Sequence, residues 1–86
     1  MNELAKENTP RAPRIDVGSA PQIEMTGNRQ INIEGSTGIL LYSSDHIKIN
    51  TARMVISFHG RGLRLRCISS SCVEIDGFIS DLEFLT

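Results

Sequence analysis

The residues whose types could support binding or catalysis are most concentrated in residues 60–77, GRGLRLRCISSSCVEIDG. It contains three arginines, two cysteines and three consecutive serines within eighteen positions. Arginines at this density could bind phosphate groups, paired thiols could bind zinc or form a disulfide, and a serine could act as a nucleophile. Which of these happens depends on the elements that position the side chains.

The cysteines and histidines do not have the spacing of a metal site. Structural zinc sites usually contain close pairs such as C-x2-C. Here His46, His59, Cys67 and Cys72 are separated by twelve, seven and four residues. Strand alternation would place Cys67 in the core as a small hydrophobe and turn Cys72 away, which disfavours a disulfide. We therefore expect no metal and no cofactor, with both histidines as exposed turn residues.

A catalytic set is not recognisable either. The serine run 69–71 has no G-x-S-x-G context, and no histidine with an orienting carboxylate is near it in the sequence. The carboxylates of Glu74, Asp76, Asp81 and Glu83 alternate along the last segments, as they would on a solvated face of a sheet. The sequence therefore predicts a protein that is not an enzyme.

The arginines are predicted to be neutralised within the fold. If residues 69–71 form a turn centred on Ser70, Arg66 faces Glu74 and Arg64 faces Asp76 on the neighbouring strand. Such cross-strand pairs contribute only about 0.2–1 kcal/mol each, but they occupy the charge that a phosphate backbone would need. This predicted strand pair does not include three other basic residues, namely Lys48, Arg53 and Arg61.

A nucleic-acid-binding β-barrel of OB-like character is the alternative function. It would use the basic groups of Arg53, Arg61, Arg64 and Arg66. Such binding needs exposed aromatic rings between the basic groups, and the chain has one Tyr, three Phe and no Trp. Its formal net charge of -1 gives no general attraction to polyanions. Nucleic-acid binding is therefore the less favoured reading.

The length of 86 residues and a hydrophobic content of 40% suffice for one small domain. All three prolines fall at or before Pro21, in a segment with few large apolar groups. We therefore divide the chain into a flexible, disordered tail at residues 1–20 and a single domain at residues 21–86. No apolar run is long enough to insert into a membrane or to serve as a secretory signal, which indicates a cytoplasmic protein.

From Pro21 onward, short alternating apolar runs end at Gly, Asn, Asp or Ser, which is typical of β-strands joined by tight turns. The expected strands are 22–26, 30–34, 38–43, 46–50, 54–59, 63–68, 73–76 and 78–85. The fold class is therefore all-β, an antiparallel meander of about six to eight short strands. It could form a curled sheet, an open barrel or two stacked sheets.

Alternation predicts one buried face and one partly apolar opposite face. The buried face would contain Ile31, Ile33, Ile39, Leu41, Ile47, Ile49, Met54, Ile56, Phe58, Leu63, Leu65, Cys67, Val73 and Ile75. The opposite face would carry Leu40, Tyr42, Val55 and Ile79, with Lys48, Arg53 and Arg61 as its rim. An apolar second face needs a cover, so we expect it to bind a protein partner or a second copy of the chain.

Three segments follow one another between residues 21 and 85, namely PQIEMTGNRQINIEG, STGILLYSSDHIKINTARMVISFHGRGLRLRCI and CVEIDGFISDLEFL. Their order resembles the YabP/YqfC family of bacterial sporulation proteins, and most closely its YqfC branch. At residues 34–39 this chain reads EGSTGI where the branch usually has E-N-H-r-G-I, so no role of that Asn-His pair is carried over.

The resemblance implies a small non-enzymatic protein in the mother-cell cytoplasm of an endospore-forming bacterium. It also implies a membrane-anchored sporulation partner of the YqfD type at the forespore membrane. Together with the apolar second face, this predicts a β-sheet interaction or scaffold module, with a homo-oligomer as a further possibility.

Overall fold

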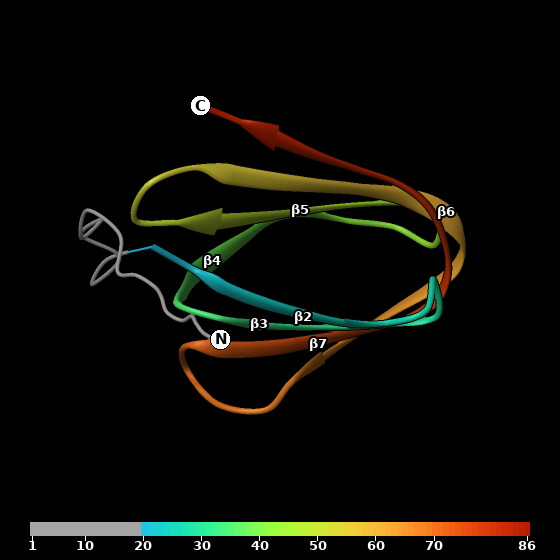
Figure 1. Cartoon of the computed structure of the whole chain (residues 1–86), viewed down its shortest axis with the longest axis horizontal. Coiled ribbons are helices and arrows are strands. Elements are labelled where there is room, and N and C mark those ends of the chain that lie inside the picture. Colours follow the sequence, from blue (N-terminus) through green and yellow to red (C-terminus); the bar gives the residue numbers. More distant parts are fainter. Residues whose placement is uncertain (1–19) are drawn as a thin grey trace, which may run out of the picture.

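The computed structural model describes residues 20–86, so nearly all of the expected tail lies outside the described residues. The described chain forms β2 (Gln22–Thr26), β3 (Gln30–Glu34), β4 (Ser36–Tyr42), β5 (His46–Thr51), β6 (Val55–Cys67) and β7 (Cys72–Leu85). These strands make one antiparallel sheet in the order β2-β3-β7-β6-β5-β4 (Figure 1). The all-β fold class, with a curled sheet, is confirmed.

Two long strands replace four of the expected short ones. β6 joins the segments expected at 54–59 and 63–68, and β7 joins those expected at 73–76 and 78–85. The glycines between them were expected at strand ends, but they lie inside paired strands where the register shifts. Such irregularities bend a strand without ending it.

The bend folds the single sheet into two layers (Figure 1). The lower layer contains β2, β3, the first part of β7 and the last part of β6, because β3 pairs with residues 72–76 of β7. The upper layer contains β4, β5, the first part of β6 and the last part of β7, because β5 pairs with residues 55–59 of β6. The sheet does not close, and β2 and β4 are its edge strands.

Glycines make the bend sterically possible. A Cβ atom on Gly60 would lie 1.8 Å from the carbonyl oxygen of Phe78 on the neighbouring strand. Gly77 has a φ of +135°, and a Cβ there would lie 2.6 Å from the carbonyl oxygen of Gly62. The two strands therefore cross at a distance that only residues without a side chain allow.

The core lies between the two layers. It consists of side chains at most 6% exposed, namely Ile31, Ile33, Leu63, Val73 and Ile75 from the lower layer and Ile47, Ile49, Ile56, Phe58 and Ile79 from the upper layer. Nine of these ten positions were predicted from alternation. Folding one amphipathic sheet over its apolar face buries that face against itself, so no second domain is needed to cover it.

Strand β4 departs from the predicted alternation. The register shifts between Ile39 and Leu41, so Leu40 lies in a bulge and the following residues exchange faces. Ile39 and Tyr42 pair with the core residues Ile49 and Ile47, whereas Leu41 pairs with Lys48 on the outer face. The expectation that Leu41 faces the core and Tyr42 the outer face is therefore wrong.

Two further predictions of burial are wrong. Ile79 was expected on the outer face, but the register shift that skips Ser80 turns it into the core, where it is 6% exposed. Cys67 was expected in the core, but it is exposed. It is the last residue of β6, beyond the part of that strand that β5 covers. Both cysteines are free.

Candidate functional site

The outer face of the upper layer carries a cluster of two histidines, a serine and an aspartate. The rings of His46 and His59 stack with centroids 4.0 Å apart and an interplanar angle of 19°. His46 Nε2 lies 2.9 Å from Ser57 Oγ, and His59 Nδ1 lies 3.9 Å from an oxygen of Asp81. The two histidines were expected in turns, but they occupy β5 and β6, where they face each other across the strand pair.

This cluster contains the side-chain types of a nucleophilic site, but its serine is not accessible to a substrate. Ser57 is only 2% exposed, so its hydroxyl cannot meet a substrate without local unfolding. The parallel stacking of the two rings also prevents their nitrogens from converging on one ion. Within residues 20–86, no group of three or more His, Cys, Asp or Glu side chains could hold a metal ion. The cluster is best explained as packing of the polar face.

The arginines of β6 have the predicted register, but neither predicted ion pair forms among the described residues. Arg66 faces Glu74 and Arg64 faces Asp76, as expected from a turn centred on Ser70. The ion pair runs diagonally instead, from Arg66 to Asp76 at 3.4 Å. Glu74 instead accepts a hydrogen bond from the side-chain amide of Gln30 on β3, so its partner is an uncharged group. Long side chains reach diagonal neighbours on a twisted sheet, so register alone does not determine their partners.

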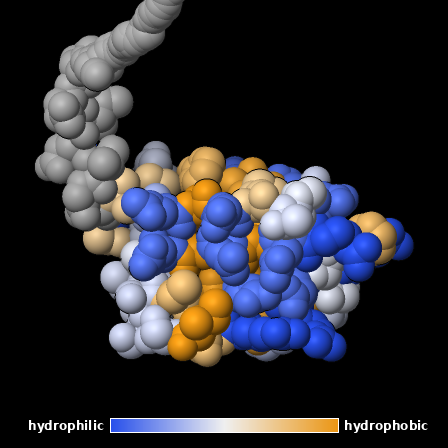
Figure 2. Space-filling model, turned by 60° about the horizontal axis from the view of Figure 1, so that its bottom comes forward, coloured by the Kyte–Doolittle hydropathy of each residue, from blue (hydrophilic) through white to orange (hydrophobic). Residues whose placement is uncertain are grey.

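The basic residues of the nucleic-acid alternative do not share one surface. Arg53 lies in the turn between β5 and β6, and Arg61 lies at the bend. Arg64 and Arg66 lie on the outer face of the lower layer, where Figure 2 shows mainly hydrophilic side chains with hydrophobic groups toward one end. Phe58, the aromatic residue nearest to them in sequence, is fully buried. This arrangement provides no continuous basic path with stacking rings.

The largest run of exposed apolar side chains lies on β4. Ile39, Leu40, Leu41 and Tyr42 are 40%, 57%, 41% and 52% exposed. We call these four residues the apolar edge. Among the described strands, β4 pairs only with β5. Its other side is held to the last part of β6 and the following loop at its two ends, by the Ser36 N–H, which donates to the carbonyl oxygen of Ser71, and by the Tyr42 hydroxyl. An exposed edge strand with four consecutive large apolar residues is a typical site for association with another protein.

The rest of the predicted partner-binding set is scattered. Lys48 lies beside Leu41 in the neighbouring strand and therefore borders the apolar edge. Val55 is half-buried on β6 and is separated from β4 by β5. With Ile79 in the core, the structure places Leu40, Tyr42 and Lys48 together and leaves Val55, Arg53 and Arg61 elsewhere.

Tyr42 also connects the two layers. Its hydroxyl accepts a hydrogen bond of 3.2 Å from the backbone N–H of Leu65, which lies in the lower part of β6. Neither the length nor the composition of β4 indicates this contact. The bulge at Leu40 produces it, because it turns Tyr42 toward the lower layer.

Replacing Tyr42 by phenylalanine should remove this hydrogen bond and keep the ring. We expect a loss of stability of only about 0.5–1 kcal/mol, because water can reach the freed N–H. Amide hydrogen exchange is the more selective measurement, and Leu65 should exchange faster while core amides such as that of Ile75 do not. Unchanged exchange at Leu65 would show that Tyr42 does not join the layers.

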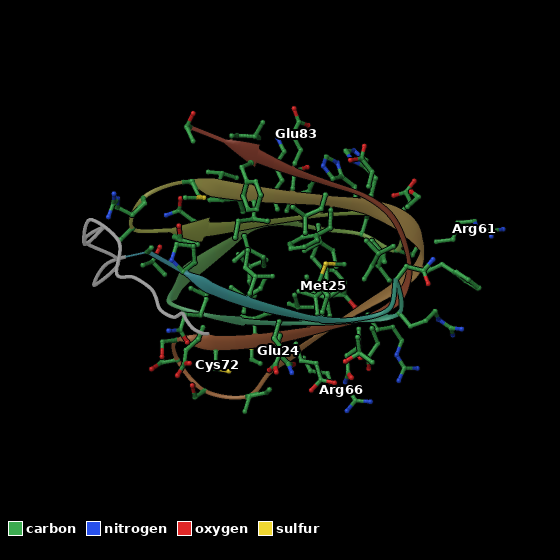
Figure 3. All side chains as sticks on the ribbon, viewed as in Figure 1. Glu24, Met25, Arg61, Arg66, Cys72 and Glu83 are labelled. Carbon is green, nitrogen blue, oxygen red and sulfur yellow. The ribbon has the colours of Figure 1, made fainter. Side chains whose placement is uncertain are left out.

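A second apolar feature lies where the sheet is open, between β2 and the end of β7. It is a groove of about 420 Å³ lined by Ala20, Pro21, Ile23, Met54, Phe84 and Thr86. Met25 on β2 is 47% exposed, and in Figure 3 its side chain projects from β2 toward the upper layer. Sequence reasoning missed this groove, because its lining comes from three separate segments.

The described fold is that of a small all-β protein built from one folded-over antiparallel sheet. The model of the YabP family matches residues 18–86, which include all six strands. The chain therefore belongs to the YabP family and is a sporulation-associated protein. The match supports the YabP/YqfC resemblance and does not separate the YqfC branch from the others.

The comparison with curated proteins gave no match. Among residues 20–86, no helical segment has the length and apolar character of a membrane span.

Proposed function

We propose that this chain is a non-enzymatic interaction module of sporulation that binds a protein partner through the apolar edge. The observation that carries the proposal is the exposure of four consecutive apolar residues, Ile39, Leu40, Leu41 and Tyr42, on a strand that has only one paired neighbour among the described strands. In water such a strip is costly unless another surface covers it. The buried serine of the histidine cluster favours binding over catalysis.

The partner would contribute an apolar segment. β4 carries no charged residue, so nothing along it repels an incoming strand or apolar side chain. The bulge at Leu40 interrupts regular strand pairing, and contacts with the side chains of Leu40 and Leu41 should therefore supply much of the affinity. Lys48 would lie at the rim of the contact.

The setting of the proposal comes from the family. A sporulation-associated chain of this kind would act in the mother-cell cytoplasm, and a membrane-anchored protein of the YqfD type would bring it to the forespore membrane. The scaffold role follows from the same edge, which holds a partner without changing it chemically. A second copy of the chain is the other candidate occupant of the edge, and light scattering separates the two.

The test replaces Leu40 and Leu41 by aspartate in one variant. Charges on both residues should abolish co-purification with the YqfD-type membrane protein. They should also reduce spore formation in a host in which the variant is the only copy of this protein. The fold should persist, because both side chains are already exposed. Urea unfolding of the purified variant checks this.

Ile68→Asp is the matched control. Ile68 is 58% exposed and lies outside β4, in the loop before β7, so the variant adds one of the two charges of the test variant at an apolar position as exposed as Leu40. It should leave co-purification unchanged. Equal losses in both variants, or normal co-purification of the Leu40 and Leu41 variant, would contradict the proposal. Light scattering then measures the oligomeric state. If the wild type is an oligomer that the Leu40 and Leu41 variant dissociates and Ile68→Asp does not, the occupant of the apolar edge is a second copy.

A further inference from the structure

At the bend of the sheet, two arginines gather on one exposed aromatic ring. Phe78 is 45% exposed, the guanidinium carbon of Arg29 lies 4.3 Å from its ring centroid, and that of Arg61 lies 5.4 Å from it. Arg29 comes from the turn between β2 and β3, whereas Arg61 and Phe78 are opposite each other on β6 and β7. From this arrangement we infer a binding site for a carboxylate group of an acidic protein segment.

Arg29 is held in an orientation suited to an oxyanion. Its Nε–H donates a hydrogen bond of 3.2 Å to the carbonyl oxygen of Gly77, and its guanidinium carbon lies over the Phe78 ring. The turn that carries Arg29 is itself fixed, because the amides of Gly77 and Ile79 donate to the carbonyls of Arg29 and Asn28. No described residue accepts a hydrogen bond from the two Nη groups of Arg29. A carboxylate can accept from such a guanidinium with two parallel hydrogen bonds.

The charge of this pair is not compensated within the described residues. No carboxylate of residues 20–86 lies within 4.0 Å of Arg29 or Arg61, and the ion pairs found there involve Arg66 and His59 instead. The two guanidinium groups near one ring repel each other, and an anion bound beside them would be attracted to both and would offset this repulsion. The site therefore gains more from an anion than an isolated surface arginine does.

A hollow adjoins the ring on the side of Arg61. It has a volume of about 440 Å³ and is lined by Asn28, Gly60, Arg61, Phe78, Ile79 and Ser80. Asn28 can donate from its side-chain amide, while the Ser80 hydroxyl already donates to the carbonyl oxygen of His59. Figure 3 shows Arg61 extending outward at this end of the molecule, where a partner can approach it.

A protein carboxylate fits this site better than a nucleic acid or a membrane does. Arg29 and Arg61 both lie against the Phe78 ring, so they compete with a base for stacking on it. Two arginines give only about 2 kcal/mol of attraction to an anionic membrane surface, at about 1 kcal/mol per charge, and the chain has a net charge of -1. A carboxylate needs only one well-oriented guanidinium and gains from a second.

The test is a fluorescence-anisotropy titration at low salt with a fluorescein-labelled glutamate-rich peptide, and with the glutamine-rich peptide of equal length for comparison. The protein should bind only the glutamate peptide. The double variant Arg29→Gln and Arg61→Gln should weaken that binding at least about tenfold. The variant Phe78→Leu, which keeps an apolar side chain but removes the ring support, should weaken it several-fold.

Arg64→Gln is the control, because it removes one positive charge, by the same type of substitution, from an exposed arginine of β6 that does not contact Phe78. It should change the affinity less than twofold, and all variants should unfold at the wild-type urea concentration. Equal effects of Arg64→Gln and the double variant would overturn the inference. Tighter binding to a single-stranded oligonucleotide or to phosphatidylglycerol vesicles would also overturn it. The Leu40 and Leu41 variant should bind the peptide normally. The peptide titration therefore tests the carboxylate site independently of the proposed function of the apolar edge.

Discussion

Gly60→Ala is expected to destabilise the protein by about 3 kcal/mol or more, which is a large share of the stability of a domain of this size. The new Cβ atom would lie 1.8 Å from the carbonyl oxygen of Phe78, and this neighbour is backbone that cannot rotate away. Relief requires the two strands to separate at the bend. That separation would open the core where the layers meet and would move Phe78 relative to Arg29 and Arg61.

Gly38→Ala provides the matched control. Gly38 lies in β4, a Cβ atom at this position would meet no other atom within 4 Å, and its φ is not positive. Alanine in a strand loses less backbone entropy on folding than glycine, so this variant should be as stable as the wild type or slightly more stable. Urea unfolding followed by circular dichroism compares the two. Similar midpoints for Gly60→Ala and Gly38→Ala would mean that the bend tolerates a side chain and that the strands do not cross so closely.

The local pattern of the chain predicts much of this fold. Short alternating runs with polar punctuation identified β2 and β3 to the residue. The serine turn predicted the strand register that places Arg66 opposite Glu74 and Arg64 opposite Asp76, although not the ion pair that forms. Alternation also predicted nine of the ten core side chains, because a sheet with one solvated face must place its apolar residues at every second position.

The irregular positions could not be predicted in the same way. Glycine is common both in tight turns and at bends inside a strand. Gly60 and Gly77 alone therefore do not distinguish two hairpins from one folded sheet. A single bulge then reverses all later assignments of a strand to a face. This is why Tyr42 and Ile79 were assigned to the wrong side.

The candidate sites show the same limit. Alternation along ILLY assigned Leu40 and Tyr42 to an exposed face. Both side chains are exposed, although the bulge turns Tyr42 to the core side. Arg29 was not recognised, because its contact with Phe78 joins residues 49 positions apart and depends on where the β2–β3 turn meets β7. Sites made by local sequence could be predicted, and sites made by the bend could not.

Phe58→Ala is expected to cost about 3–5 kcal/mol. Phe58 is fully buried and is the largest of the fully buried side chains. It pairs with Ile47 on one side and with Leu82 on the other, so its ring lies in the middle of the upper layer and faces the lower layer. Neighbouring strands fix the backbone on both sides, and the cavity left by the ring could close only if the two layers moved together.

Phe84→Ala separates this packing effect from the loss of an aromatic side chain in general. Phe84 lies on the same strand pair, opposite Ile56, but it is 52% exposed and lines the groove between β2 and β7. Its replacement should cost less than about 1 kcal/mol, because half of its surface already contacts water.

The stability loss of Phe58→Leu should fall between those of Phe58→Ala and Phe84→Ala, since leucine refills part of the cavity. Urea unfolding of the three variants ranks them, and equal losses for Phe58→Ala and Phe84→Ala would show that the interior between the layers is not packed as described. The predicted ranking would confirm that folding one sheet over its own apolar face provides the stability that lets β4 leave its apolar residues exposed for a partner.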